Sequence, residues 1–160
     1  MPNCFEGSFS VPTGTRFAIV VARYNQSITD KLLAGALETL TSHGVEDRDI
    51  DVARVPGAWE IPVIAQQFAS GGDYGAVICL GAVVRGETTH DQHINRQVST
   101  ALGQIALQHD LPVLFGVLTC NTMEQAIHRA GGNVGNKGSE AALAALEMIS
   151  LRAAMGPTAR

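Results

Sequence analysis

Ten consecutive residues, Gly81 to His90, combine the side chains and the chain turn best suited to chemistry. They read Gly-Ala-Val-Val-Arg-Gly-Glu-Thr-Thr-His. The apolar residues up to Val84 predict a buried strand, and the break at Arg85-Gly86 followed by Thr-Thr-His predicts the first turn of a helix. Backbone N–H groups at a helix start lack internal partners and lie at the positive end of the helix dipole, so this junction could bind a phosphate. An ordinary strand-to-helix turn, with a solvated Arg85 and a capping threonine, fits the same residues.

Other patterns that carry chemistry are incomplete. Residues 135–139, Gly-Asn-Lys-Gly-Ser, lack the Gly-Lys-Ser succession of a triphosphate loop and follow no predicted strand. His90 and His93 enclose Asp91 at a spacing that two metal ligands could use, but no third ligand is suitably spaced, so we expect no metal site. The glycine fingerprint of dinucleotide sites and the Gly-x-Ser-x-Gly nucleophile motif are absent from the sequence. The sequence therefore carries no nucleotide-binding signature of these kinds.

The composition is typical of a globular protein with a sizeable core. The chain has 160 residues, of which 46% are hydrophobic and only 5% aromatic. A domain of about 150 residues buries roughly two-thirds of its unfolded surface, so we expect a single domain over residues 1–160, with residues 1–15 as an N-terminal arm. The formal net charge of -4 argues against a general binder of nucleic acid or membrane.

Cysteine usage and hydropathy indicate the compartment. Cys4, Cys79 and Cys120 are odd in number and form no Cys-x-x-Cys pair, so neither a disulfide framework nor a zinc site is indicated. No apolar run approaches the ~20 residues of a membrane span, and the first residues lack the basic-then-apolar pattern of a secretory leader. We expect a cytoplasmic protein.

Strand and helix patterns alternate along the chain. Strands are predicted at residues 17–23, 50–55, 76–84 and 111–117. Helices are predicted from Ser27 to about 42, from about 59 to 70, from 89 to 109, from Asn121 to about 130, and from Ser139 to about 154, with residues 156–160 as an irregular arm. Ser27 with Asp30 has the form of a capping box, and Asn121 is the expected cap of the fourth helix.

This alternation predicts a parallel sheet with helices on both faces, because parallel strands need crossover connections. Ligands of such sheets bind at the carboxyl ends of the strands. Tyr24, residues 56–60, residues 85–90 and the residues just after Phe115 are all expected at those ends. The elements thus bring the opening segment together with an aromatic ring and a carboxylate.

Five separated motifs identify a family. They are Arg23-Tyr-Asn25, Val55-Pro-Gly-Ala-Trp-Glu-Ile-Pro62, the segment Gly81 to His90, Phe115-Gly-Val-Leu-Thr119, and Glu124 to Gly131 with Gly135 to Ala142. In order and spacing they resemble lumazine synthase over about residues 16–152. The resemblance implies a flavodoxin-like three-layer sandwich with a four-stranded parallel sheet. It also implies condensation of 5-amino-6-(ribitylamino)uracil with 3,4-dihydroxy-2-butanone 4-phosphate to 6,7-dimethyl-8-ribityllumazine, phosphate and water, the penultimate step of riboflavin synthesis, without cofactor or metal.

The resemblance also assigns residues. His90 corresponds to the family residue proposed to transfer protons. Gly86, Glu87 and Thr88 correspond to the residues that bind the substrate phosphate. The residues that correspond to those binding the heterocycle and the ribityl chain are Tyr24, Asn25, Ala58, Trp59, Glu60, Val83 and Val84. Phe115, Arg129 and Lys137 correspond to residues that the neighbouring subunit supplies. From the residues alone, Tyr24 fits a surface tyrosine, Glu60 a carboxylate favoured by a helix dipole, and Arg129 or Lys137 a solvated charge.

Family members assemble as pentamers, and many bacterial ones as shells of twelve pentamers. The compact loop from Gly131 to Lys137 favours such a shell of sixty subunits. The chain departs from the common family pattern at Asp91-Gln92-His93, where an aromatic, an acidic and another aromatic residue are common, and this puts the packing and electrostatic setting of His90 in question. Two alternative functions stay open, namely a non-catalytic flavin or lumazine binder and a riboflavin synthase of the archaeal type. The intact His90 and Arg129 argue against the binder.

Overall fold

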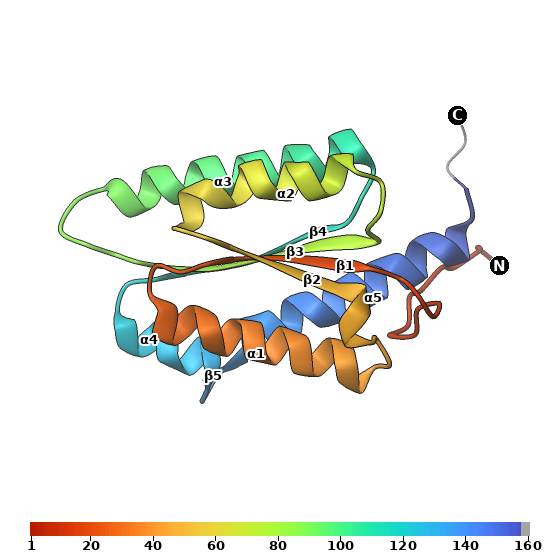
Figure 1. Cartoon of the computed structure of the whole chain (residues 1–160), viewed down its shortest axis with the longest axis horizontal. Helices are drawn as coiled ribbons and strands as arrows, with labels where there is room; N and C mark the ends of the chain where they lie inside the picture. The colour runs from red at the N-terminus through yellow and green to blue at the C-terminus, as the bar shows by residue number, and fades with distance from the viewer. Residues whose placement is uncertain (158–160) are drawn as a thin grey trace.

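The computed structural model describes residues 1–157 and forms a three-layer sandwich (Figure 1). A parallel sheet of order β2-β1-β3-β4 lies in the middle. Its strands are β1 (Phe17–Ala22), β2 (Ile50–Val55), β3 (Ala76–Val84) and β4 (Val113–Cys120). Helices α2 (Ile61–Ser70) and α3 (His90–His109) cover one face; α1 (Gln26–Ser42), α4 (Met123–Arg129) and α5 (Lys137–Met155) cover the other. The predicted flavodoxin-like architecture is confirmed.

The core lies on both faces of the sheet because its central strands are apolar at every position. All six residues of β1 are buried. Phe17, Ile19 and Val21 pack toward α1 and α5, whereas Ala18 and Val20 pack toward α2 and α3. A strand covered on both faces has no solvent side, and so it shows a continuous apolar run rather than an alternating pattern. Residues 1–16 contain no helix or strand and contact α5, where the Ser8 N–H donates to Ser150 Oγ at 2.9 Å.

The predicted fourth strand was displaced. The strand begins at Val113 rather than at residue 111 and continues to Cys120, because its ladder with β3 runs on to the pair Val84–Cys120. Phe115 pairs with Cys79 in the first half of the strand. The residues just after Phe115 therefore lie within the strand, and their expected position at its carboxyl end was wrong.

The predicted starts of α1, α4 and α5 were also wrong, the first two at their capping residues. Asn25 caps α1 in the left-handed conformation, with φ 61°, and Ser27 lies inside the helix. Thr122 rather than Asn121 caps α4, its Oγ1 accepting from the Gln125 N–H at 3.2 Å.

Helix α5 begins at Lys137 rather than at Ser139, because the Asn136 side chain accepts from the N–H groups of Gly138 and Ser139. A short antiparallel pair precedes it, β5 (Ala130–Gly132) with β6 (Gly135–Asn136). Of the predicted C-terminal arm, residues 156–157 follow α5 and residues 158–160 lie outside the described part of the chain.

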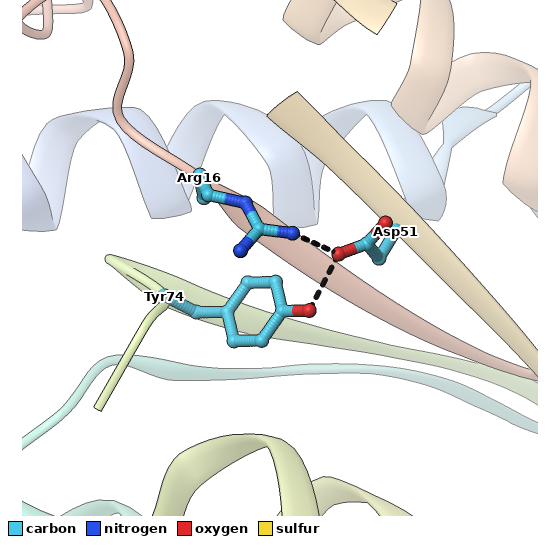
Figure 2. Close-up of polar contacts among 3 residues, drawn as sticks. All are labelled: Arg16, Asp51 and Tyr74. Atoms are coloured by element: carbon cyan, nitrogen blue, oxygen red, sulfur yellow. Dashed lines mark hydrogen bonds and ion pairs between the residues drawn. The ribbon is translucent and has the colours of Figure 1, made fainter. Parts of the chain in front are cut away.

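A polar cluster joins three segments at the amino-terminal ends of the strands (Figure 2). Asp51 of β2 accepts hydrogen bonds from the Arg16 guanidinium and from the Tyr74 hydroxyl. The Arg16 guanidinium also lies over the Tyr74 ring, 4.8 Å from its centroid. The hydrogen bond to Asp51, together with burial, raises the pKa of Tyr74 above its ordinary value. The cluster fixes the start of the sheet and leaves the opposite end of the sheet for the site.

Candidate active site

A cavity of about 590 Å³ lies at the carboxyl ends of β1, β2 and β3. The segment at the end of each strand forms part of the cavity wall, as expected for a sheet of this topology. The lining residues are Tyr24, Pro56, Gly57, Ala58, Trp59, Glu60, Ala82, Val83, Val84, Gly86, Thr88, His90, Asp91 and Ile94. The structure thus brings together three of the five motifs that the sequence singled out.

Two exposed aromatic side chains border the cavity. Tyr24 follows β1 and is 73% exposed, and Trp59 lies in the 3₁₀ turn η2 (Ala58–Glu60) and is 57% exposed. The Tyr24 N–H donates to the Pro56 carbonyl at 3.0 Å, so the segments after β1 and β2 are held side by side. Exposed rings at the rim of a cavity offer a flat surface on which a planar heterocycle can stack.

The turn η2 places a carboxylate beside these rings. The Glu60 N–H donates to the Gly57 carbonyl at 3.2 Å, and Pro62 lies in the first turn of α2, where it needs no hydrogen-bond partner. Glu60 directly precedes α2, so the dipole of that helix favours its negative charge. Its carboxylate can accept hydrogen bonds from the hydroxyl or amine groups of a ligand.

The junction between β3 and α3 has the predicted form of an anion site. The Arg85 N–H is held by the Cys120 carbonyl at 2.8 Å, and α3 begins at His90. Thr88 Oγ1 accepts from the His90 N–H at 3.3 Å. Gly86, Thr88 and His90 line the cavity, whereas Glu87 is exposed beside it. Free backbone N–H groups at the start of a long helix, next to an imidazole, can bind a phosphate and exchange protons with a ligand.

Besides Glu87, four of the predicted site residues do not line the cavity. Asn25 contacts the site indirectly, because its Nδ2 donates at 2.9 Å to the carbonyl of Ala82, which lines the cavity. Phe115 is 41% exposed on the edge strand β4. Arg129 ends α4 and Lys137 begins α5, both on the other face of the sheet. Within one chain, the aromatic ring and the two cations therefore do not reach the cavity.

Sequence reasoning missed two lining residues on α3, Asp91 and Ile94. Helical spacing was the signal for both. They lie on the same face of α3 as the buried residues Val98, Leu102 and Ile105, nearer to the start of the helix. Ala82 was also missed as a lining residue, because its place in an apolar strand indicated only core packing.

Other chemistry is sparse in the described residues 1–157. They hold no group of three or more His, Cys, Asp or Glu side chains arranged for a metal ion, and no helix among them is long and apolar enough to cross a membrane.

Burial raises the pKa of the Cys79 and Cys120 thiols, although Arg129 partly offsets this at Cys120. A smaller cavity, about 390 Å³, is lined by residues that include Tyr74, His109 and Arg152, away from the strand ends that form the main site.

Comparisons with known proteins agree with the motifs. Residues 14–153 match the family model described as 6,7-dimethyl-8-ribityllumazine synthase. A protein of Desulfotalea psychrophila (strain LSv54 / DSM 12343) named 6,7-dimethyl-8-ribityllumazine synthase is 54% identical over 151 residues, which cover 94% of this chain and 97% of that protein. The matched residues include every segment that lines the cavity.

Proposed function

Because this chain belongs to the 6,7-dimethyl-8-ribityllumazine synthase family, we propose that its cavity condenses 5-amino-6-(ribitylamino)uracil with 3,4-dihydroxy-2-butanone 4-phosphate. The enzyme is thus a transferase of the penultimate step of riboflavin biosynthesis. The observation that carries the assignment to this cavity is the meeting of an aromatic rim, a carboxylate and a helix start at one sheet edge.

The pyrimidine substrate binds between the aromatic rim and the end of β3. Tyr24 stacks on the heterocycle and Trp59 borders it. The main chain of Val83 and Val84 contacts the ring edge, and Asn25 holds this strand end through its bond to Ala82. Ala58, through its backbone, and Glu60 take the hydroxyl groups of the ribityl chain.

The butanone phosphate binds at the start of α3. Its phosphate lies against Gly86, Glu87 and Thr88, where free N–H groups and the helix dipole favour an anion. The bound substrates react as an amine and a ketone: an imine forms with loss of water, phosphate leaves, and ring closure of the ribitylamino nitrogen on the remaining carbonyl, with loss of a second water, gives the lumazine. His90 lines the cavity beside this loop and moves protons in these steps.

The second half of the site comes from a neighbouring subunit. Phe115, Arg129 and Lys137 do not line the cavity of their own chain. We propose that a neighbour's Arg129 contacts the phosphate, that its Lys137 lies near the ribityl chain and ring, and that its Phe115 closes the pocket. The assembly is a homopentamer, and twelve pentamers form a shell of sixty subunits.

Residues 1–160 form one domain with residues 1–15 as its arm, a reading supported by the family match over residues 14–153. We place the protein in the cytoplasm, since three unpaired thiols suit a reducing compartment. Its partners are small-molecule substrates and copies of itself.

Incubation of the purified protein with both substrates, in the presence of a chelator, tests the function. We expect lumazine and free phosphate in equal amounts. A parallel incubation with lumazine alone tests the alternatives, since a riboflavin synthase would form riboflavin and a binder would form nothing in either reaction. Loss of activity on chelation that a divalent ion restores would contradict the cofactor-free reaction.

A further inference from the structure

Arg129 and Lys137, the two cations proposed to serve a neighbouring cavity, lie at the same end of the β5–β6 hairpin. Ala130 pairs with Asn136 in this antiparallel ladder, and the two cations are the residues directly outside that pair. Within residues 1–157, no ion pair joins either cation to a carboxylate. Neighbouring like charges repel each other, and Lys137 lies at the positive end of the α5 dipole, so electrostatics within the chain do not hold it in place.

Asn136, the residue directly before Lys137, fixes this point of the chain with both ends of its side-chain amide. Its Oδ1 accepts from the Gly138 N–H at 2.8 Å and from the Ser139 N–H at 3.1 Å. Its Nδ2 donates to the Lys31 carbonyl of α1 at 3.0 Å. The first two bonds cap α5, and the third ties the start of α5 to the side of α1. Asparagine suits both tasks because its amide carries an acceptor and a donor, whereas an ionised aspartate carries acceptors only.

Helix α1 leaves room for this amide at Gly35. A Cβ added to Gly35 would lie 2.6 Å from the Cγ, Nδ2 and Oδ1 atoms of Asn136, closer than side chains approach in proteins. Gly35 is buried in the interior of α1, where glycine is unfavourable compared with alanine. The glycine therefore weakens the helix but lets the Asn136 amide reach α1. Two positions far apart in the sequence thus serve the same contact.

Building on the function proposed above, we infer that Asn136 is a positioning residue that holds Lys137 where it reaches the ribityl chain and ring in the neighbouring cavity. A cap alone does not require asparagine, and Thr122 caps α4 with a hydroxyl. The tie to α1 is the additional contact. It restrains the first turn of α5, so the long lysine side chain starts from a fixed backbone and less freedom is lost when it binds a ligand.

Steady-state kinetics of two variants test the tie from its two sides. Asn136→Ser keeps an acceptor for the cap and removes the donor to Lys31. Gly35→Ala pushes the amide away from α1 and leaves the capping residue in place, while the better helix propensity of alanine offsets part of the lost stability. In both variants we expect the KM for the pyrimidine substrate to rise about threefold to tenfold, as for loss of one neutral hydrogen bond, and the KM for the butanone phosphate to stay within about twofold. Tyr74→Phe is the matched control, because it also removes one hydrogen bond but at the end of the sheet opposite the cavity, and it should change neither KM.

A double-mutant cycle with Lys137 separates positioning from a structural role. Lys137→Met removes the cation at similar length and should raise the pyrimidine KM about tenfold to hundredfold. In that background Asn136→Ser should raise the KM no further, because the group that Asn136 positions is absent. The fall in melting temperature caused by Asn136→Ser should be the same in both backgrounds, because its bonds do not involve the lysine side chain. A purely structural Asn136 would instead change kcat or KM by the same factor with and without Lys137.

Calorimetric titration with 6,7-dimethyl-8-ribityllumazine repeats the cycle without turnover. We expect the affinity to fall about threefold to tenfold in Asn136→Ser and in Gly35→Ala. Neither substitution should weaken binding further when it is added to Lys137→Met.

The outcomes also distinguish this inference from the proposed function. If the wild type forms lumazine but Asn136→Ser and Gly35→Ala leave the pyrimidine KM and the affinity for ribityllumazine unchanged, the inference is wrong and the function stands. An unchanged KM and affinity in Lys137→Met also overturns the inference, whether or not lumazine forms. If the wild type forms no lumazine but the affinities follow the expected cycle, the function is wrong and the positioning role stands. If the wild type neither forms lumazine nor binds ribityllumazine, both are wrong. Should Asn136→Ser fail to fold, Gly35→Ala gives the same comparison.

Discussion

His90 lines the cavity at the first position of α3, next to the loop proposed to bind phosphate. We expect His90→Ala to lower kcat by up to about 10²-fold, because general acid–base assistance is typically worth 10²–10⁴-fold and holding two substrates together supplies part of the rate. The KM for the pyrimidine substrate should change little. His93→Ala is the control, since His93 is exposed and outside the cavity wall. Wild-type turnover in His90→Ala across neutral pH would show that the imidazole has no such role.

Arg129 does not line the cavity of its own chain, so its contribution tests the shared site. Arg129→Ala should raise the KM for the butanone phosphate about tenfold to hundredfold, since a charge-assisted contact to phosphate is worth roughly 1.5–3 kcal/mol. Steady-state kinetics with each substrate varied in turn measure this. Arg48→Ala removes an exposed cation whose ion pair within residues 1–157 is with Glu46, and it should change neither KM. An unchanged KM in Arg129→Ala would remove Arg129 from the site.

From residue type and local pattern alone, residues of the cavity wall could be predicted only where the side chain itself can do chemistry or bind a ligand. Tyr24, Glu60 and His90 carry chemistry and follow predicted strands, and the structure places all three on the wall. Asp91 could be recognised only once the inward face of α3 was known, because a carboxylate in a first helical turn is common on any helix. Whether Phe115, Arg129 and Lys137 complete the site depends on contacts between chains, and so it stays a prediction.

Elements were predictable where the local pattern was strong. The bounds predicted for β2 and β3 are those observed, because apolar runs there end abruptly at turn residues. At α4 the neighbours Asn121 and Thr122 are both good caps, and only the geometry of the chain after β4 selects Thr122. The β5–β6 pair escaped prediction because a glycine-rich loop has no apolar alternation to indicate strands.

The cluster of Arg16, Asp51 and Tyr74 makes the start of the sheet sensitive to alkaline pH. Because the folded pKa of Tyr74 is raised, its contribution to stability is fully present below the unfolded value near 10 and is lost as pH rises through the folded pKa. Tyr74→Phe should therefore lower the melting temperature at pH 8. The difference from wild type should shrink as the pH is raised above 10. A constant difference across this range would show that the titration of Tyr74 is not linked to folding.

Helices α1 and α5 approach each other at a glycine. A Cβ added to Gly138 would lie 1.9 Å from the Leu32 carbonyl oxygen, so Gly138→Ala requires the backbones to move apart. We expect a loss of about 3 kcal/mol in the free energy of unfolding, measured by denaturant titration. Gly103→Ala, in α3, where the new Cβ would have no described atom within 4 Å apart from the backbone of its own helix and its chain neighbours, should instead stabilise by about 0.5–1 kcal/mol. Equal effects of the two substitutions would contradict the close approach.

At the scale of the whole molecule, the proposed sharing of the cavity between subunits predicts that catalysis depends on assembly. A ring of head-to-tail contacts closes into a cyclic oligomer and brings each neighbour's residues to the next cavity. Mixing impaired Arg129→Ala subunits with impaired His90→Ala subunits should, after joint refolding, give more activity at low butanone phosphate than either variant alone, because some interfaces then combine two intact halves. Sedimentation gives the final state, with particles near one megadalton for a shell and a species near five times 16.8 kDa for a pentamer. An active monomer would contradict the shared site.

Trp59 is the single tryptophan of the sequence, and it lines the cavity with 57% of its surface exposed. All indole fluorescence of the protein therefore originates at the rim of this cavity. A lumazine or flavin ring bound beside Trp59 absorbs in the region where indole emits, so occupancy can be followed as quenching in the unlabelled enzyme. The same emission reports the polarity of the rim during each turnover, and the chain thus carries its own optical probe of the reaction it catalyses.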